Sequence, residues 1–460
     1  MFGGRGYRRL TKRKITNVRN NMNKPIVAVV GRPNVGKSTF FNKVTGKKIS
    51  IVKDRPGVTR DRVYCDAEWC GKSFTLIDTG GIELKSTDEM WGHIKKQAEI
   101  AVETADVIIF MCDFKGGLTA SDEDVADMLR RSRKPIVLAV NKADNFDPTA
   151  QAEYYSLGLG EPFMISCEQG KGLGDLLDEV CSHFDAIDEG EDSEYIKIAI
   201  VGKPNAGKSS LANKLLGADR TIVSNIAGTT RDSIDTPLIY NGKKYMIIDT
   251  AGIRKKSAVH EDVEYYSVIR ALASIRRADV CLAVIDSTEG LTEQDVKILG
   301  YVHEQGKPSV VVMNKWDAVD KDAYTIEKFK KKLDADLAFM SYYKSIFVSA
   351  KTGQRVDKIF SLINEVLANA NKRFTTGTLN DIIGDAVRTT EPPTRNGRRL
   401  KIYYTVQEGV CPPTFIMFVN SQDLMHFSYR RYIENVLRNA LDFSGTPIRI
   451  IVREKKGDEE

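Results

Sequence analysis

The string GRPNVGKS occupies residues 31–38, and GKPNAGKS recurs at residues 202–209. Each copy follows a short apolar run and precedes a segment with helical spacing, the context in which GxxxxGK[ST] predicts a phosphate-binding loop. The glycines let backbone N–H groups turn inward around phosphate oxygens, and the start of the helix adds its positive dipole end. We therefore expect a nucleoside triphosphate to bind at both places.

The two strings belong to a longer duplication. Their offset of 171 residues continues without a gap over about fifty positions. The repeated positions are Asn42 and Asn213, Gly46 and Gly217, Asp61 and Asp232, and DTGG at 78–81 and DTAG at 249–252. A period of this length is too long for a solenoid, so we interpret it as a duplicated domain.

Short apolar runs alternate with helical patterns in each copy, which predicts an α/β class with two tandem, mostly parallel, doubly wound sheets. The runs are 26–30, 74–78, 107–112, 135–140 and 163–166 in the first copy, and 196–201, 246–249, 280–286, 308–313 and 345–349 in the second. The pattern then changes to helix 379–389, strand 400–406, strand 414–420, helix 428–441 and strand 447–452. This order predicts a small C-terminal α+β domain.

Composition sets the expected domain boundaries. The acidic string DAIDEGEDSEY has few large apolar residues and reads as a self-repelling linker. The expected segments are a basic tail at 1–21, a first copy of the duplicated domain at 22–184, the linker at 185–195, a second copy at 196–371, the α+β domain at 372–456 and a disordered tail at 457–460.

The basic balance of the chain comes from its first residues. The sequence holds 68 Lys plus Arg and 62 Asp plus Glu, a formal charge of +6. Residues 1–21 contribute seven basic residues and no acidic one, and could be a start-site extension, an organellar leader or an RNA-binding arm. Residues 22–194 carry 21 basic and 30 acidic residues, whereas residues 195–371 carry 26 and 21. This asymmetry suggests domains with different roles.

Composition also excludes several classes of protein. No run of about 18 apolar residues occurs, and no apolar segment of a secretory signal follows the basic start. The seven cysteines form no CxxC pair, and the five histidines make no metal-ligand pattern. We expect a soluble, cytoplasmic protein with reduced thiols.

A second motif, NKAD at 141–144 and NKWD at 314–317, specifies the base. Here the sequence resembles the translation-factor-related GTPases. The carboxylates of Asp144 and Asp317 can accept hydrogen bonds from N1–H and the 2-amino group of guanine, which adenine lacks. With ATP that carboxylate would stay unpaired, a discrimination on the order of 10⁴.

Neighbouring residues complete the base site that this resemblance implies. Asn141 and Asn314 would brace the loop and contact N7, and the stems of Lys142 and Lys315 would pack over the ring. Backbone N–H groups of SCE at 166–168 and SAK at 349–351 would bind O6. Cys167 stands where the motif usually has Ala, and we expect little effect because the contact comes from the backbone.

Residues for the γ-phosphate and Mg²⁺ recur in both copies. Lys37 and Lys208 would neutralise the β and γ phosphates. The Mg²⁺ ligands expected are Ser38, Thr59, Asp78, Ser209, Thr230 and Asp249. The residues expected to act in catalysis are Lys37, Thr59, Gly81, Lys208, Thr230 and Gly252. Because the Thr and Gly contacts exist only with GTP, hydrolysis should release both switch loops.

The glutamine that orients water in Ras-like enzymes is absent, since Ile82 and Ile253 take its place. Intrinsic hydrolysis should be slow unless another group supplies positive charge. Asn34 and Asn205 match the residue that helps to bind K⁺ in related GTPases. The rival charge donors are the switch arginines, Arg60 and Arg231.

The complete nucleotide-contacting sets follow from these motifs. In the first copy they are Gly31, Arg32, Pro33, Asn34, Val35, Gly36, Lys37, Ser38, Thr39, Asp78, Thr79, Gly80, Gly81, Ile82, Asn141, Lys142, Ala143, Asp144, Ser166 and Cys167. In the second they are Gly202, Lys203, Pro204, Asn205, Ala206, Gly207, Lys208, Ser209, Ser210, Asp249, Thr250, Ala251, Gly252, Ile253, Asn314, Lys315, Trp316, Asp317, Ser349 and Ala350.

Two tandem GTPase domains followed by a short α+β domain resemble the EngA/Der family of bacterial ribosome-assembly GTPases. The resemblance covers residues 22 to about 456 and includes the late strings GRRLKIYY and PPTFIMFVN. It implies a KH-like third domain, association with the large ribosomal subunit and its rRNA, and nucleotide-controlled rearrangement of the first G domain.

The third domain lacks the GxxG loop of a KH clamp, yet it carries basic residues near aromatic ones. These residues, Arg395, Arg398, Arg399, Arg430 and Arg431, could face RNA or pack against the G domains. In the second switch, Arg254, Lys255 and Lys256 could contact RNA phosphates or remain solvated.

We therefore expect a hydrolase that converts GTP to GDP and phosphate at two sites with Mg²⁺ and K⁺, and that acts in large-subunit assembly. It should be a monomer off the ribosome with no DNA or membrane partner. The alternatives are a scaffold with one non-hydrolysing G domain and a signalling GTPase with a protein effector.

Overall fold

The computed structural model describes residues 25–46, 64–78, 90–144, 148–184, 194–217, 221–222, 235–250, 263–322, 324–395 and 397–455. The chain divides into two compact units, Met1–Ser193 and Glu194–Glu460. Each unit builds its core from the apolar runs of the sequence, and each is described by itself.

The first unit is a mixed six-stranded sheet with the order β2-β3-β1-β4-β5-β6. All neighbouring strands run parallel except β2 and β3, which form an antiparallel hairpin at one edge. The strands are β1 (Ile26–Val30), β2 (Tyr64–Trp69), β3 (Lys72–Asp78), β4 (Val107–Asp113), β5 (Ile136–Asn141) and β6 (Pro162–Met164). The central strands β1 and β4 are buried almost throughout because helices cover both faces.

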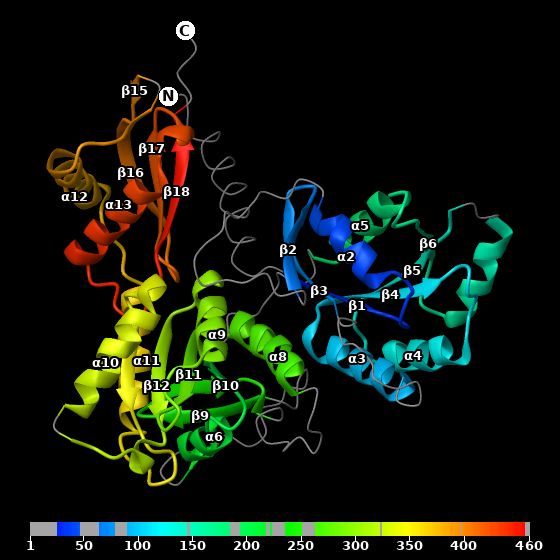
Figure 1. Cartoon of the computed structure of the whole chain (residues 1–460), viewed down its shortest axis with the longest axis horizontal. Coiled ribbons are helices and arrows are strands. Elements are labelled where there is room, and N and C mark those ends of the chain that lie inside the picture. Colours follow the sequence, from blue (N-terminus) through cyan, green and yellow to red (C-terminus); the bar gives the residue numbers. More distant parts are fainter. Residues whose placement is uncertain are drawn as a thin grey trace, which may run out of the picture. The chain divides into compact units, whose positions relative to one another are not determined.

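Helices α2 and α5 lie over one face of this sheet, and α3 and α4 lie over the other (Figure 1). The helices are α2 (Lys37–Gly46), α3 (Met90–Thr104), α4 (Ala120–Arg131) and α5 (Leu173–Ser182), with a 3₁₀ segment at Pro148–Leu157. The predicted doubly wound α/β class is confirmed. The carboxyl ends of β1, β4 and β5 therefore meet at one edge, where a ligand binds in this class of fold.

The second unit repeats this plan in a seven-stranded sheet with the order β13-β12-β11-β7-β10-β9-β8. Its strands are β7 (Ile196–Val201), β8 (Thr221–Ile222), β9 (Thr236–Tyr240), β10 (Lys243–Ile247), β11 (Val280–Asp286), β12 (Ser309–Asn314) and β13 (Lys344–Phe347). Its helices are α6 (Lys208–Leu216), α8 (Val263–Arg277), α9 (Glu293–Glu304), α10 (Thr325–Asp336) and α11 (Lys358–Ala370). The apolar residues of β7, β11 and β12 pack with α6 and α11 into one core.

The C-terminal part of this unit is the predicted α+β domain. Its elements are α12 (Thr376–Thr389), β14 (Thr394–Arg395), β15 (Arg398–Arg399), β16 (Ile402–Gly409), β17 (Thr414–Val419), α13 (Phe427–Ala440) and β18 (Arg449–Glu454). The sheet has the order β16-β17-β18, with β18 parallel to β17. The apolar faces of α12 and α13 pack with residues such as Phe415 and Met417, so one face of the sheet forms the core.

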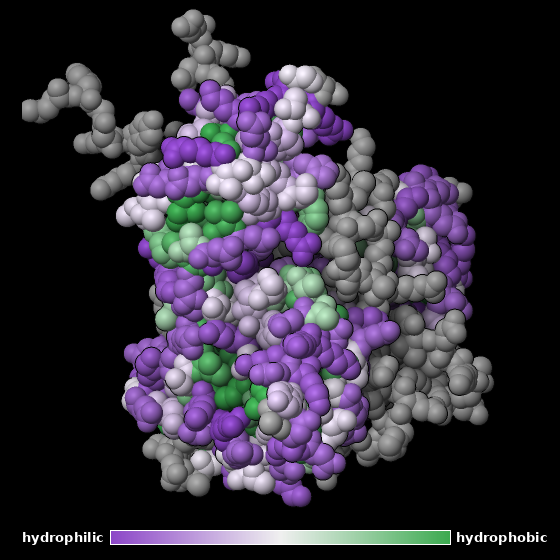
Figure 2. Space-filling model, turned by 60° about the vertical axis from the view of Figure 1, so that its left-hand side comes forward, coloured by the Kyte–Doolittle hydropathy of each residue, from purple (hydrophilic) through white to green (hydrophobic). Residues whose placement is uncertain are grey.

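The α+β domain is joined to the second G domain by backbone and side-chain contacts. The N–H of Gly445 donates to the carbonyl of Tyr342 at 2.7 Å, and the N–H of Ser309 donates to the carbonyl of Gly445 at 2.8 Å. The guanidinium of Arg438 lies 4.4 Å from the centroid of the Tyr342 ring. These contacts tie the two parts of the unit together. The face of this unit shown in Figure 2 is largely hydrophilic, and its apolar patches are separate from one another.

Candidate nucleotide-binding sites

The glycines of the two phosphate-binding loops have no room for a side chain. A Cβ on Gly36 would lie 2.2 Å from Nδ2 of Asn141, and a Cβ on Gly207 would lie 2.2 Å from Nδ2 of Asn314. Both glycines adopt φ values that L-residues avoid, +100° and +92°. The backbone of each loop therefore passes against the base loop, in the same geometry in both units.

Both loop lysines point at their own loop, and Lys37 is buried whereas Lys208 is half-buried. The ammonium of Lys37 donates to the carbonyls of Gly31 at 2.5 Å and Arg32 at 2.7 Å. Lys208 does the same with Gly202 and Lys203, both at 2.7 Å. Burial lowers the pKa of each lysine to about 8, with Asp78 opposing the shift in the first site and Asp295 in the second. A bound phosphate would supply an anionic partner for each of these ammonium groups.

The residues present fit a Mg²⁺ ion in the first site. The hydroxyl of Ser38 donates to Oδ2 of Asp78 at 3.2 Å, so two oxygen donors stand side by side. Asp78 ends β3 and is buried. In the second site Asp249 has φ +57°, and its N–H donates to Oδ1 of Asp235 at 2.9 Å. Bound Mg²⁺ would neutralise charge that develops on the phosphate oxygens.

An asparagine side chain links the phosphate loop and the base loops in each site. Nδ2 of Asn141 donates to the carbonyl of Val35 at 2.8 Å, and its Oδ1 accepts the N–H of Cys167 at 3.0 Å. Asn314 makes the matching bonds to the carbonyl of Ala206 at 2.9 Å and the N–H of Ala350 at 3.0 Å. The predicted bracing role is therefore visible, while the contact with guanine N7 stays a prediction.

The lysine of each NKxD motif is held by the aspartate that ends the neighbouring strand. Nζ of Lys142 lies 2.6 Å from Oδ2 of Asp113, and Nζ of Lys315 lies 2.5 Å from Oδ2 of Asp286. Sequence reasoning missed these aspartates. A signal was present, because each is the strand-end partner of the motif asparagine in the parallel ladder.

The two aspartates that are predicted to specify the base differ in their partners. Oδ1 of Asp144 accepts the hydroxyl of Ser166 at 2.6 Å, and Oδ2 lies 2.8 Å from Nζ of Lys115. These two contacts lower the pKa of Asp144, the lysine contributing most. In the second site the hydroxyl of Ser349 is the main cause of the lowered pKa of Asp317.

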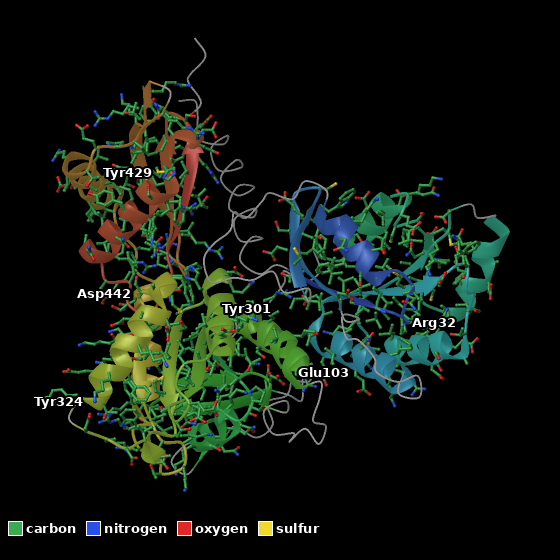
Figure 3. The ribbon with its side chains drawn as sticks, viewed as in Figure 1. Arg32, Glu103, Tyr301, Tyr324, Tyr429 and Asp442 are labelled. Carbon is green, nitrogen blue, oxygen red and sulfur yellow. The ribbon has the colours of Figure 1, made fainter. Side chains whose placement is uncertain are left out.

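The second residue of each phosphate loop also differs. Nε of Arg32 lies 3.0 Å from Oδ1 and 2.9 Å from Oδ2 of Asp122 at the start of α4, and Nη2 donates to the carbonyl of Gly117 at 2.9 Å. Figure 3 shows Arg32 beside α4. Lys203 instead pairs with Glu289 at 2.5 Å and stays 4.0 Å from Asp295. Arg32 thus ties the first loop to the start of α4, whereas Lys203 ties the second loop to the segment between β11 and α9.

Several predicted residues lie outside the described residues. They are Thr59, Arg60, Thr79, Gly80, Gly81, Ile82, Thr230, Arg231, Ala251, Gly252, Ile253, Arg254, Lys255 and Lys256. The remaining predicted residues of both sites are described, and the asparagine and aspartate contacts bring the phosphate and base loops together in each.

Comparison with known proteins identifies the family. A family model described as a 50S ribosome-binding GTPase matches residues 26–142 and 197–315, and a model described as the KH-domain-like C-terminal domain of EngA bacterial GTPases matches residues 373–453. A GTPase Der from Clostridium kluyveri is 57% identical over 437 residues, which cover 95% of this chain and 100% of the relative. The chain belongs to the EngA/Der family of GTPases.

A second EngA/Der relative, the GTPase Der from Acetivibrio thermocellus, is 55% identical over 438 residues, covering 95% of this chain and all of the relative. The predicted family is therefore confirmed, and with it GTP hydrolysis by a protein that binds GTP or GDP and Mg²⁺. The C-terminal α+β domain is the KH-like domain of this family. Among the described residues, no helix combines the length and apolar character needed to cross a bilayer.

Proposed function

We propose that both sites of this EngA/Der GTPase hydrolyse GTP and that the nucleotide state controls its action in assembly of the large ribosomal subunit. One observation carries the two-site proposal. The contacts that join phosphate loop, NKxD motif and following loop recur atom for atom, through Asn141 in one unit and Asn314 in the other. The two sites therefore position their loops alike, which supports the same chemistry at both.

The site residues act in this proposal by binding and orienting GTP. Loop N–H groups and the ammonium groups of Lys37 and Lys208 hold the phosphates, and Asp144 and Asp317 hold guanine. Burial lowers the pKa of each loop lysine to about 8, so it destabilises the charged lysine in the free site. A bound phosphate stabilises that charged form. Threonines 59 and 230 and glycines 81 and 252 complete the γ-phosphate contacts.

The test of two-site hydrolysis compares Lys37→Ala with Lys208→Ala in the full chain. Each variant should lose turnover at its own site by about 10²–10³-fold, because a charge that stabilises the transition state is removed. The remaining turnover then belongs to the other site. If one variant keeps the full rate, one domain is a non-hydrolysing scaffold and the two-site proposal fails.

We also propose K⁺ as a cofactor of hydrolysis. Asn34 and Asn205 are exposed at the rims of the two loops, and both adopt left-handed backbone conformations, with φ +66° and +61°. Both side chains are therefore accessible to a cation beside the phosphates. Hydrolysis should be faster in K⁺ than in Na⁺ of equal ionic strength. Equal rates would leave the switch arginines as the charge donors.

The proposed ribosomal contact uses the KH-like domain. Arg395, Arg398 and Arg399 are exposed on the β14–β15 hairpin, and the nearby rings of Tyr403 and Tyr404 are 43% and 38% exposed. Arg431 instead donates to the carbonyl of Ala338 in the second G domain at 3.4 Å. The basic set is thus divided between a surface for rRNA and a packing surface.

Sedimentation with ribosomal subunits tests this contact. We expect the protein in large-subunit fractions, with an occupancy that differs between GTP and GDP. Replacing Arg395, Arg398 and Arg399 by Ala should weaken that binding and its salt dependence. Arg388→Ala is the matched control, because Arg388 is 81% exposed and pairs with Asp385 one helical turn away. Absence from large-subunit fractions in both nucleotide states contradicts the assembly role.

The remaining proposals concern organisation. We propose domain boundaries at 22–184, 196–371 and 372–456, a monomer off the ribosome, and a cytoplasmic location. Light scattering of the purified chain at several concentrations tests the monomer, and a mass that rises with concentration would contradict it.

A further inference from the structure

The guanine-binding end of the first site holds an ion pair that has no counterpart among the described residues of the second. Nζ of Lys115 lies 2.8 Å from Oδ2 of Asp144, while the hydroxyl of Ser166 donates to Oδ1 at 2.6 Å. Both carboxylate oxygens are therefore already engaged. Asp144 in turn is the largest cause of the raised pKa of Lys115.

Lys115 stands two residues after the aspartate that ends β4, and Thr288 stands two residues after the aspartate that ends β11. The N–H and hydroxyl of Thr288 donate to Oδ1 of Asp286, at 2.9 and 2.7 Å, and do not reach the base carboxylate. Within the described part of the second unit, no Lys or Arg forms an ion pair with Asp317. Lys351 and Lys321 act on Asp317 only through space, so the two base sites differ by one direct lysine contact.

Guanine needs the carboxylate that Lys115 holds. Its N1–H and 2-amino groups together donate to two oxygens, so the bond from Lys115 to Oδ2 has to break or be shared when the base arrives. The side chain of Lys115 is 64% exposed and can move at little cost. The acidic Glu168 also raises its pKa, so a released ammonium still faces an acidic neighbour.

We propose that Lys115 sets the guanine affinity of the first site, because its ammonium competes with the base for the carboxylate of Asp144. This inference rests on the proposed contact between Asp144 and guanine. The second site has Thr288 at the corresponding place, so guanine meets no such competitor there. The first site then binds guanine nucleotides more weakly than its Asp144 and Ser166 geometry alone would allow.

The experiment measures binding of fluorescent GDP to the full chain at one site at a time. Lys208→Ala silences the second site, and Lys115→Thr is added to it. We expect affinity at the first site to rise about two- to fivefold, the range for an exposed ion pair. The gain should shrink as salt rises from 0.05 to about 0.5 M, because salt screens the pair. Lys115→Gln should behave like Lys115→Thr.

Two further variants make the test specific. In a Lys37→Ala background, Thr288→Lys should lower affinity at the second site by a similar factor. Lys171 acts on the Asp144 carboxylate through its charge alone, so Lys171→Thr is the matched control and should not raise affinity. Thermal melting of each variant checks that the fold is intact.

An unchanged or weaker affinity in both Lys115 variants overturns the proposal. An unchanged affinity would mean that Lys115 has no effect on binding, and a weaker one that Lys115 stabilises the bound base. Asp144→Asn separates this from a failure of the proposed function. If Asp144→Asn abolishes the preference for GDP over ADP while the Lys115 variants show no gain, only the role of Lys115 is wrong. If the preference survives Asp144→Asn, the guanine contact itself is wrong.

Discussion

The two nucleotide sites agree in the buried contacts that join the phosphate loop to the base loops, and they differ in side chains around those contacts. Gly36 and Gly207, Lys37 and Lys208, and Asn141 and Asn314 make the same contacts at nearly the same distances. Lys115 and Arg32 in the first site have Thr288 and Lys203 as their counterparts. Features that position phosphate depend on tight backbone geometry, which tolerates little change. Side chains at the rim can vary, and they adjust affinity without altering the chemistry.

The largest effect is expected when the aspartates that bind guanine are replaced, and it tests whether both sites recognise guanine by the same contacts. Asp144→Asn and Asp317→Asn each replace an acceptor-only carboxylate by an amide. Guanine preference over adenine at the altered site should fall by up to about 10⁴-fold, because the N1–H and 2-amino donors lose their acceptor. Competition binding with GDP and ADP measures it, with the other site silenced. A preference that survives at one site would show that the two bases are held differently.

Substitution of the loop glycines is expected to affect the two sites equally. Gly36→Ala and Gly207→Ala put a methyl group 2.2 Å from a buried asparagine amide, on a backbone with positive φ. Nucleotide affinity at the altered site should fall by about 10²–10³-fold. Gly71→Ala and Gly242→Ala are matched controls, since both have positive φ and nothing within 4 Å of the added Cβ. Equal losses in controls and loop variants would assign the effect to backbone strain alone.

Nucleotide affinity should depend on pH in the same way at both sites, because burial lowers the pKa of both Lys37 and Lys208 to about 8. Bound phosphate favours the charged lysine, so nucleotide binding raises that pKa. Affinity is then fully present below pH 8 and is lost as pH rises above it, by up to about tenfold per pH unit at each site. Titrations at pH 7, 8 and 9 in the single-site backgrounds measure this. A flat profile at either site contradicts the assignment.

The smallest expected effect is on stability, and it concerns the second residue of each phosphate loop, Arg32 or Lys203. Oδ1 of Asp295 is buried and accepts no hydrogen bond from the described residues, whereas Nε of Arg32 contacts both oxygens of Asp122. Lys203→Arg should satisfy Asp295 and stabilise the second unit by about 1 kcal/mol. That corresponds to a melting shift of about 2–4 °C. Arg32→Lys should shift the first unit in the opposite direction. A destabilised Lys203→Arg protein would show that the arginine does not fit.

Much of this arrangement was predictable because its residues follow strand ends. The GxxxxGK[ST] and NKxD strings come directly after β1, β5, β7 and β12, and parallel strands bring those ends to one edge. The spans of α12 and α13 also lie within three residues of the predicted helices, because their apolar residues recur at helical spacing.

Other features depend on information that the sequence pattern does not carry. Strands β2 and β9 were not predicted, because the prediction relied on continuous apolar runs. Tyr64–Trp69 instead alternates polar and apolar residues, and Thr236–Tyr240 contains a proline. The pairs of Lys115 with Asp144 and of Arg32 with Asp122 join residues 29 and 90 positions apart. Such contacts depend on loop conformation and rotamers, which periodicity does not determine.

Single-turnover hydrolysis tests the central claim that both sites are complete GTPases. The full chain is loaded with labelled GTP, freed of excess nucleotide, and started with Mg²⁺ in K⁺ buffer. The account predicts the release of two phosphates per chain from the unaltered protein and one from each of the Lys37→Ala and Lys208→Ala variants. Release of a single phosphate from the unaltered chain, with no loss in one of the variants, would contradict it.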